Sequence, residues 1–135
     1  MLEARNSKKQ GDIGVGLAIA WCAKRGYTVC IPLTDSQEYD LVIEMPEGLK
    51  RFQVKTTRHI ARRLPHHNGA YSADLRTKGT NRGQTVTTKR LDVTQVDYVF
   101  IVTDANDIYL IPSSELKGLS KVQLGAHYQQ YKTEL

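Results

Sequence analysis

The sequence has few cysteines and no long apolar run. Its two cysteines, Cys22 and Cys30, lie in apolar surroundings without a C-x-x-C pair or a histidine at ligand spacing. This excludes a disulfide framework and a zinc site, and we expect both cysteines in the core. The longest apolar run, residues 13–23, is interrupted by two glycines and is much shorter than the roughly 20 residues of a membrane span. Together with a polar start that is unlike a secretory signal, these absences predict a cytoplasmic protein with no membrane partner.

Familiar nucleotide-binding and hydrolase motifs are absent as well. Gly11 and Gly16 have the spacing of a P-loop, but the required Lys and Ser or Thr do not follow. Neither a G-x-G-x-x-G fingerprint nor a G-x-S-x-G nucleophile elbow occurs. The histidines lack the helical spacing of a metal site, and three of them are expected to contact phosphate or solvent: His59, His66 and His67.

The composition is that of one globular domain with an uneven charge. The 135 residues, of which 40% are hydrophobic and 24% charged, allow a single core. From Lys50 to Arg90, eleven lysines and arginines stand against a single acid, Asp74, a net charge of +10, whereas the rest of the chain sums to −5. Such a segment is either a solvated basic loop or the binding surface for a polyanion, and its density favours nucleic acid.

Hydrophobic periodicity predicts a helix followed by a β-meander. Apolar residues recur at helical spacing over residues 10–25, Gly26 stands at the C′ position, and Asp12 is expected to point into the domain. Three strands are predicted next, at 27–33, 39–44 and 49–57. Residues 58–88 read as ribbons or loops. Strands at 97–103 and 108–111, a short helix at 113–116 and a brief strand at 122–124 complete the prediction.

The second and third predicted strands form a hairpin that brings polar residues together. If the turn is centred between Pro46 and Glu47, Asp40 faces Gln53, and Lys55 lies two residues further along the same face. Directly opposed residues have Cβ atoms about 4.5–5.5 Å apart. The opposite face is apolar and is therefore assigned to the core, which leaves the polar trio in a cleft. The residues of the apolar face are Leu41, Ile43, Phe52 and Val54.

Asp40 followed thirteen residues later by Gln53-Val54-Lys55 resembles the PD-(D/E)XK nuclease signature. Tyr39 stands where the signature has Pro, and Gln53 stands where it has an acid. The glutamine is similar to that of the group I intron-encoded homing endonucleases within this superfamily. Further matches to that subgroup span most of the chain: the G-D-I-G of the helix, Arg25-Gly26-Tyr27, Tyr39-Asp40-Leu41, Val96-Asp97-Tyr98 and Tyr109-Leu110-Ile111-Pro112.

This resemblance implies an α/β fold with the PD-(D/E)XK core, a mixed central sheet flanked by helices. It orders the core as a helix, a three-stranded meander, a further helix and another strand. The whole chain, 1–135, would be one nuclease domain, and residues 58–90 would be its basic, DNA-contacting insertion.

The resemblance also implies a divalent metal, Mg²⁺, for which Mn²⁺ can substitute. Mg²⁺ prefers oxygen ligands, so Asp40, Gln53 through its amide oxygen, and Val54 through its peptide oxygen are the expected ligands. Asp12 would restore the charge that glutamine removes, as a fourth member of the site. Lys55 would activate the attacking water and offset charge on the phosphorane.

The expected substrate is double-stranded DNA. Arg and Lys neutralise phosphates, and Arg can also read guanine in the major groove, which a ribbon could enter. The expected DNA-binding residues are Arg58, Arg62, Arg63, Tyr71, Arg76, Lys78, Arg82, Lys89 and Arg90.

Because one domain presents one active centre, cutting both strands predicts a homodimer or homotetramer. The tail near Tyr128, Tyr131 and Leu135 is a candidate interface. The expected function is therefore a homing endonuclease that cuts a long pseudo-palindromic site. The alternatives are a restriction endonuclease or junction resolvase of the same superfamily, or a catalytically silent DNA-binding module.

Overall fold

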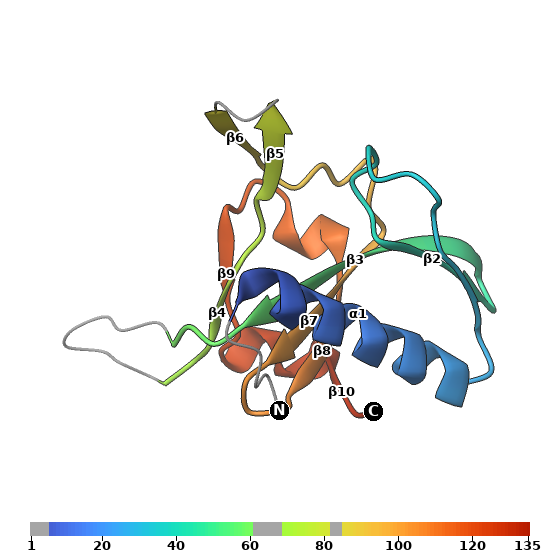
Figure 1. The fold of residues 1–135 in the computed structure, drawn as a ribbon. Helices are drawn as coiled ribbons and strands as arrows, with labels where there is room; N and C mark the ends of the chain where they lie inside the picture. The colour runs from blue at the N-terminus through green and yellow to red at the C-terminus, as the bar shows by residue number, and fades with distance from the viewer. Residues whose placement is uncertain (1–5, 61–68, 82–84) are drawn as a thin grey trace.

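A mixed sheet of six strands crosses the molecule (Figure 1). The computed structural model describes residues 6–60, 69–81 and 85–135, with residues 78–81 and 85–87 described by their backbone alone. β3 and β7 pair in parallel, and every other neighbouring pair in this sheet is antiparallel. In spatial order the strands are β1 (Thr28–Cys30), β2 (Leu41–Met45), β3 (Gly48–Thr57), β7 (Tyr98–Thr103), β8 (Ile108–Pro112) and β10 (Lys132–Thr133).

One α-helix, α1 (Ser7–Lys24), lies across one face of this sheet (Figure 1). It begins where the Asn6 side chain accepts a hydrogen bond from the Lys9 amide at 2.9 Å, and it ends before Gly26, whose positive φ of 75° reverses the chain. The predicted helix is confirmed. Cys22, in α1 itself, is buried as expected, but Cys30 is exposed on the edge strand β1, so its assignment to the core is wrong.

Both faces of the sheet are covered by protein. A first hydrophobic cluster packs between α1 and the sheet and includes Leu41, Ile43 and Phe52, as predicted for the apolar face of the hairpin. A second cluster, which includes Val99 and Ile101, fills the opposite face. Four elements outside the central sheet contribute side chains to this second cluster: β4 (Ser72–Asp74), β9 (Lys121–Gln123), η1 (Ser113–Leu116) and η2 (Ala126–Tyr131). The face expected to be an open cleft is therefore largely a second core.

The chain passes from β3 to the parallel strand β7 through β-structure. β4 pairs with β9, and β5 (Thr77–Asn81) pairs with β6 (Thr85–Lys89) as a two-stranded ribbon that projects away from the sheet (Figure 1). The prediction of ribbons in this region is confirmed. The further helix that the resemblance implied between the third and fourth core strands is not present in the described residues of this connection.

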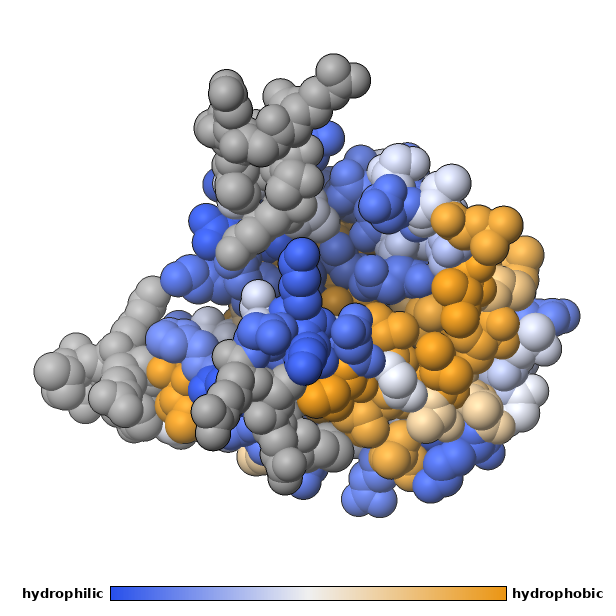
Figure 2. Space-filling model, viewed as in Figure 1, coloured by the Kyte–Doolittle hydropathy of each residue, from blue (hydrophilic) through white to orange (hydrophobic). Residues whose placement is uncertain are grey.

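Exposed apolar side chains gather near the β1 edge of the sheet. Figure 2 shows this apolar surface on the side of the molecule where β1 and β2 lie. Ile31 is 64% exposed, Leu49 is 65% exposed, and Leu33 is fully exposed.

Tyr128 and Tyr131 of the tail are half-buried and pack against the second cluster. Across the described residues, no helix has both the length and the apolar character needed to cross a membrane.

Gly14 allows α1 to approach β3 closely, and this predicts a clear effect of substitution. A Cβ at Gly14 would lie 2.5 Å from Thr56 Cγ2 and 3.2 Å from Val54 Cγ1. We therefore expect Gly14→Ala to lower the free energy of unfolding by about 1–3 kcal/mol through overpacking, as measured by urea denaturation. Gly16→Ala is the matched control, because a Cβ there meets nothing within 4 Å and should raise stability by about 0.5–1 kcal/mol. Equal stability changes for the two variants would contradict the close approach.

Candidate active site at the open edge of strand β3

The candidate site lies where β3 continues beyond the end of β2. The predicted hairpin register is confirmed, because Leu41 pairs with Phe52 and Met45 with Gly48. From Gln53 to Thr57, β3 still pairs with β7, but it has no partner in β2, because β2 begins at Leu41, opposite Phe52. Asp40 sits at this point: its amide donates to the Phe52 carbonyl at 2.8 Å, and its Oδ2 accepts from the Val54 amide at 2.7 Å. The carboxylate thus occupies the position that a continued β2 would have filled.

The environment of Asp40 opposes its charge. The residue as a whole is exposed, but its carboxyl group is partly withdrawn from water, and this desolvation raises the pKa of Asp40 above its ordinary value. The hydrogen bond from Val54 and the charge of Lys55 act in the opposite direction without fully compensating. A carboxylate held at some energetic cost is typical of a functional position, where a bound cation would offset that cost.

Gln53 presents a buried oxygen that has no partner. The residue is 6% exposed, and its Oε1 is the one buried side-chain polar atom that lacks a hydrogen bond among the described residues. Leaving such an oxygen unsatisfied costs on the order of 1–3 kcal/mol, so a native structure normally supplies a partner. An amide oxygen is a ligand of hard divalent cations. The donor set therefore fits a metal at this position.

Lys55 lies between two carboxylates. It shares a face of β3 with Gln53, because alternate residues of a strand point to the same side. Its Nζ donates to the Arg76 carbonyl at 2.9 Å. Its charge partly offsets the rise of the Asp40 pKa and contributes to the lowered pKa of Asp74. The structure therefore brings Asp40, Gln53 and Lys55 together around the open edge of β3, as the hairpin predicted.

Two other predicted members of the site differ in their placement. The Val54 amide points to Asp40, and in an extended strand the carbonyl of the same residue points to the same edge, so its peptide oxygen faces the site. Asp12 is exposed on α1, about half a turn away from Gln10 and Gly14, which both approach Thr56. The expectation that Asp12 points into the domain is wrong, and its membership of the site stays a prediction.

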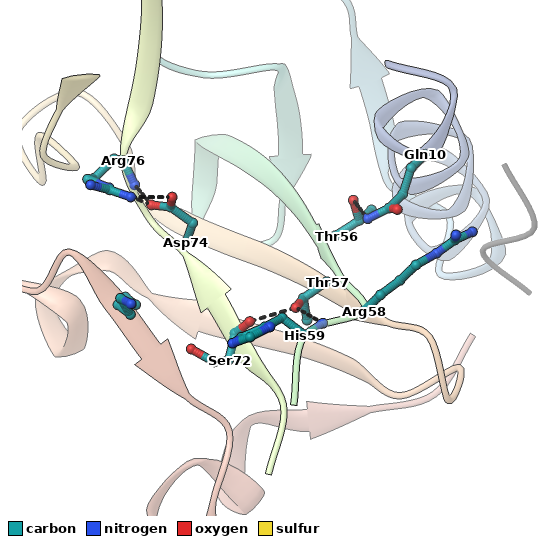
Figure 3. Close-up of a pocket in the computed structure, with 9 residues that line it drawn as sticks. Gln10, Thr56, Thr57, Arg58, His59, Ser72, Asp74 and Arg76 are labelled. Carbon is teal, nitrogen blue, oxygen red and sulfur yellow. Dashed lines mark hydrogen bonds and ion pairs between the residues drawn. The ribbon is translucent and has the colours of Figure 1, made fainter. Parts of the chain in front are cut away.

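Two adjoining cavities extend from this edge. One, of about 360 Å³, is lined by Val54 and Lys55 together with the start of α1. The other, of about 390 Å³, adds basic side chains from the end of β3 and from β9 (Figure 3). In Figure 3, Asp74 and Arg76 lie on one side of this space, and Gln10 and Arg58 lie on the other. The residues common to both cavities are Gln10, Thr56, Asp74 and Arg76.

The predicted DNA-binding residues lie in several places. Arg58 pairs with Asp104 at 3.7 Å, Arg76 pairs with Asp74 at 2.9 Å, and the Arg90 guanidinium donates to a loop carbonyl at 3.4 Å. Lys78 lies on β5 and Lys89 ends β6. Tyr71 is half-buried against the second cluster. Five expected contact residues lie outside the described part of the chain: Arg62, Arg63, His66, His67 and Arg82.

Among the cavity residues that sequence reasoning missed are Asp74, Gln10 and Lys121. Asp74 lies beside Lys55, and its pKa is lowered to about 2, chiefly by the hydrogen bond from Arg76. It could have been noticed as the single acid of the basic segment. Gln10 donates to Thr56 Oγ1 at 2.9 Å, and Lys121 lines the larger cavity. No sequence signal connects either of them to the hairpin, because only the fold brings them together.

This chain is similar to known endonucleases in sequence and in fold. The family model described as PD-(D/E)XK endonuclease matches residues 5–132. Among solved structures, this chain is similar to a bacterial homing endonuclease, I-Ssp6803I, with a TM-score of 0.71 and 27% sequence identity over 90% of this chain and 79% of that one. No curated protein sequence gives a significant match. The match over nearly the whole sequence shows that this chain belongs to the PD-(D/E)XK endonuclease family.

Proposed function

We propose that this protein is a metal-dependent, sequence-specific endonuclease of double-stranded DNA that acts as a homing endonuclease. The observation that carries the proposal is the unpartnered, buried Oε1 of Gln53, which lies on β3 between Asp40 and Lys55. A buried oxygen without a donor, beside a desolvated carboxylate, is suited to a cation. The similarity to a solved bacterial homing endonuclease favours homing over restriction or junction resolution.

Three oxygens at the β3 edge would hold the metal, and Asp12 stays a predicted fourth member of the site. They are a carboxylate oxygen of Asp40, Oε1 of Gln53 and the peptide oxygen of Val54. One carboxylate with neutral oxygens suits Mg²⁺, which keeps several waters and takes its remaining ligand from a substrate phosphate, and we expect Mn²⁺ to substitute. When bound, such a metal supplies Lewis-acid polarisation of the scissile phosphate and lowers the pKa of a bound water.

Lys55 and Asp40 have distinct roles in the proposed reaction. The Lys55 ammonium, held at the Arg76 carbonyl, orients the attacking water by hydrogen bonding and offsets negative charge that develops on the phosphorus oxygens. The Asp40 carboxylate, fixed by the Val54 amide, neither moves nor changes protonation, and it holds its metal-binding oxygen in place. Asp40 directly precedes β2 and Lys55 lies on the adjacent strand β3, and this preorganisation reduces the entropy lost on reaching the transition state.

DNA would lie across the two cavities and the β5–β6 ribbon. We assign phosphate contacts to Arg58, Lys89 and Arg90, and we place the ribbon in the major groove. Residues 58–90 would then be the DNA-contacting insertion of a single nuclease domain, 1–135. Neutralising phosphates makes binding strongly dependent on salt. Since each copy carries one such centre, we propose that two or four copies assemble to cut both strands.

The proposal is tested by incubating the purified protein with a supercoiled plasmid library and Mg²⁺, Mn²⁺, Ca²⁺ or EDTA. We expect defined double-strand ends with Mg²⁺ and Mn²⁺ and none with EDTA. A shared sequence of many base pairs around the ends indicates homing, whereas a short palindrome indicates restriction and cutting only at four-way junctions indicates a resolvase. Salt-sensitive binding with no cleavage in any metal would contradict the proposal and favour a silent DNA-binding module.

A further inference from the structure

The turn between β4 and β5 is fixed by one carboxylate. Asp74 Oδ1 accepts from the Arg76 amide at 2.9 Å and from Arg76 Nε at 3.0 Å. Asp74 Oδ2 accepts from Arg76 Nη2 at 2.9 Å. The bond to the amide two residues later forms an Asx-turn, which fixes the backbone conformation of this segment. The Arg76 guanidinium binds the same carboxylate through two further hydrogen bonds.

This turn presents the Arg76 carbonyl to Lys55. Lys55 Nζ donates to that carbonyl at 2.9 Å, and Val54, Lys55, Asp74 and Arg76 line one cavity. A lysine stem has four rotatable bonds, so its ammonium adopts a single position only if it is anchored. The anchor is a backbone oxygen whose direction depends on the Asp74 turn, because the amide and carbonyl of Arg76 belong to one short segment.

We propose that Asp74 is a positioning residue for Lys55: it fixes the turn from which the Arg76 carbonyl holds the Lys55 ammonium at the open edge of β3. The proposal rests on the proposed function, in which Lys55 assists phosphodiester cleavage. Asp74 itself touches neither the reacting phosphate nor the water. It acts through the backbone of Arg76, so its contribution depends on the placement of its carboxylate oxygen more than on its charge.

The same turn connects the DNA-binding ribbon to the site. β5 begins at Thr77, directly after Arg76, and Thr77 Oγ1 donates to Glu38 Oε2 at 3.4 Å. Glu38 lies two residues before Asp40, so the base of the ribbon contacts the segments that carry both Lys55 and Asp40. A ribbon seated on its DNA site would therefore hold the anchor of Lys55 in place, and a displaced ribbon would loosen it.

Two substitutions of Asp74 separate geometry from charge. Asp74→Asn keeps an Oδ1 acceptor for the Arg76 amide and loses the charge, whereas Asp74→Glu keeps the charge and moves the carboxylate one methylene away from the turn. We expect the single-turnover cleavage rate to fall about 10- to 100-fold in Asp74→Glu, because misplacement by about 1 Å can cost about 100-fold. Asp74→Asn should stay within about threefold of the unsubstituted protein, and both variants should bind DNA with nearly unchanged Kd.

A second readout does not depend on cleavage. In ¹⁵N-detected NMR of the lysine ammonium groups, without DNA or metal, Lys55 should give a signal protected from exchange in the unsubstituted protein and in Asp74→Asn, and it should lose that protection in Asp74→Glu. Thermal denaturation checks folding, and Asp74→Ala replaces Asp74→Glu if the latter does not fold. A protected Lys55 signal in Asp74→Glu would overturn the proposal, even if its cleavage is slow.

The outcomes separate this proposal from the proposed function. If the unsubstituted protein does not cut DNA in any metal, the proposed function fails, and the NMR comparison still decides whether Asp74 positions Lys55. Loss of cleavage in Asp74→Asn, with Lys55 protection kept, would show a direct role for the Asp74 charge and would overturn positioning.

Discussion

Asp40→Asn is expected to lower metal-dependent DNA cleavage about 1,000-fold or more while leaving DNA binding intact. Asp40 is the one carboxylate among the three proposed metal-binding oxygens, and the loss of Lewis-acid assistance costs several kcal/mol of transition-state stabilisation, where each 1.36 kcal/mol is tenfold in rate. The measurement is single-turnover cleavage of the cognate site over a range of Mg²⁺ concentrations, with Kd for the same DNA determined in Ca²⁺.

The same substitution should not destabilise the fold. Burial raises the pKa of Asp40, so the folded state binds the proton more tightly than the unfolded state, and the ionised carboxylate lowers stability at neutral pH. Asparagine removes the charge and can still accept from the Val54 amide through Oδ1. We therefore expect an equal or higher midpoint of thermal unfolding. Cleavage by Asp40→Asn at the rate of the unsubstituted protein would show that Asp40 is not a metal ligand.

Asp92→Asn is the matched control. Asp92 is an exposed aspartate whose carboxylate caps a turn by accepting from the Thr94 amide at 2.9 Å. It does not line either of the two cavities at the β3 edge. Its substitution removes one negative charge from the same small domain, so equal cleavage by this variant would show that the loss in Asp40→Asn does not arise from net charge.

The hairpin could be predicted because its physics is local. The turn at Pro46 and Glu47 fixes the register, the period of two fixes the faces, and the structure confirms the pairing of Leu41 with Phe52. From that register the convergence of Asp40, Gln53 and Lys55 follows. A sequence can therefore reveal a site when its members lie on two strands joined by a tight turn.

Contacts between segments distant in the sequence could not be predicted in the same way. Asp74 reaches Lys55 only because β4 folds back against the end of β3, where Thr57 Oγ1 donates to the Ser72 carbonyl at 2.6 Å. The second hydrophobic cluster, which covers the Gln53 face of the hairpin, is built from β7, β8 and later elements. The alternation of polar and apolar residues within the hairpin contains no information about these elements, and it therefore predicted an open face. Asp12 shows the same limit, because the large apolar residues of α1 stand at alternate positions, spread around the helix, and give a weak signal for its buried face.

The placement of Gln53 explains why a neutral residue fits a position where the family signature has an acid. The residue is buried in a face that the second core covers, and an ionised carboxylate there would carry a large desolvation cost in the absence of metal. A buried amide oxygen costs less to keep unsatisfied. The fold thus combines one desolvated carboxylate, Asp40, with a neutral oxygen, and in the proposed function Lys55 and a cation would compensate the charge.

Lys55→Met is expected to reduce the single-turnover cleavage rate by about 100- to 10,000-fold, the range for loss of a proton-transfer or charge-stabilising group. Methionine matches the length and shape of the lysine stem and removes the ammonium that donates to the Arg76 carbonyl. Lys55→Arg should also cut slowly, because a planar guanidinium cannot take the compact position of an ammonium at that carbonyl.

The control for this pair is Lys24→Met. Lys24 also donates from Nζ to a backbone carbonyl, that of Leu135, at 2.8 Å, but it lies in the last turn of α1. Its loss changes net charge by the same amount as Lys55→Met, so unchanged cleavage would localise the effect to the β3 edge. Rapid cleavage by Lys55→Met would leave Asp40 and Gln53 as a metal site without a lysine, and the chemistry at phosphorus would then depend on metal-bound groups alone.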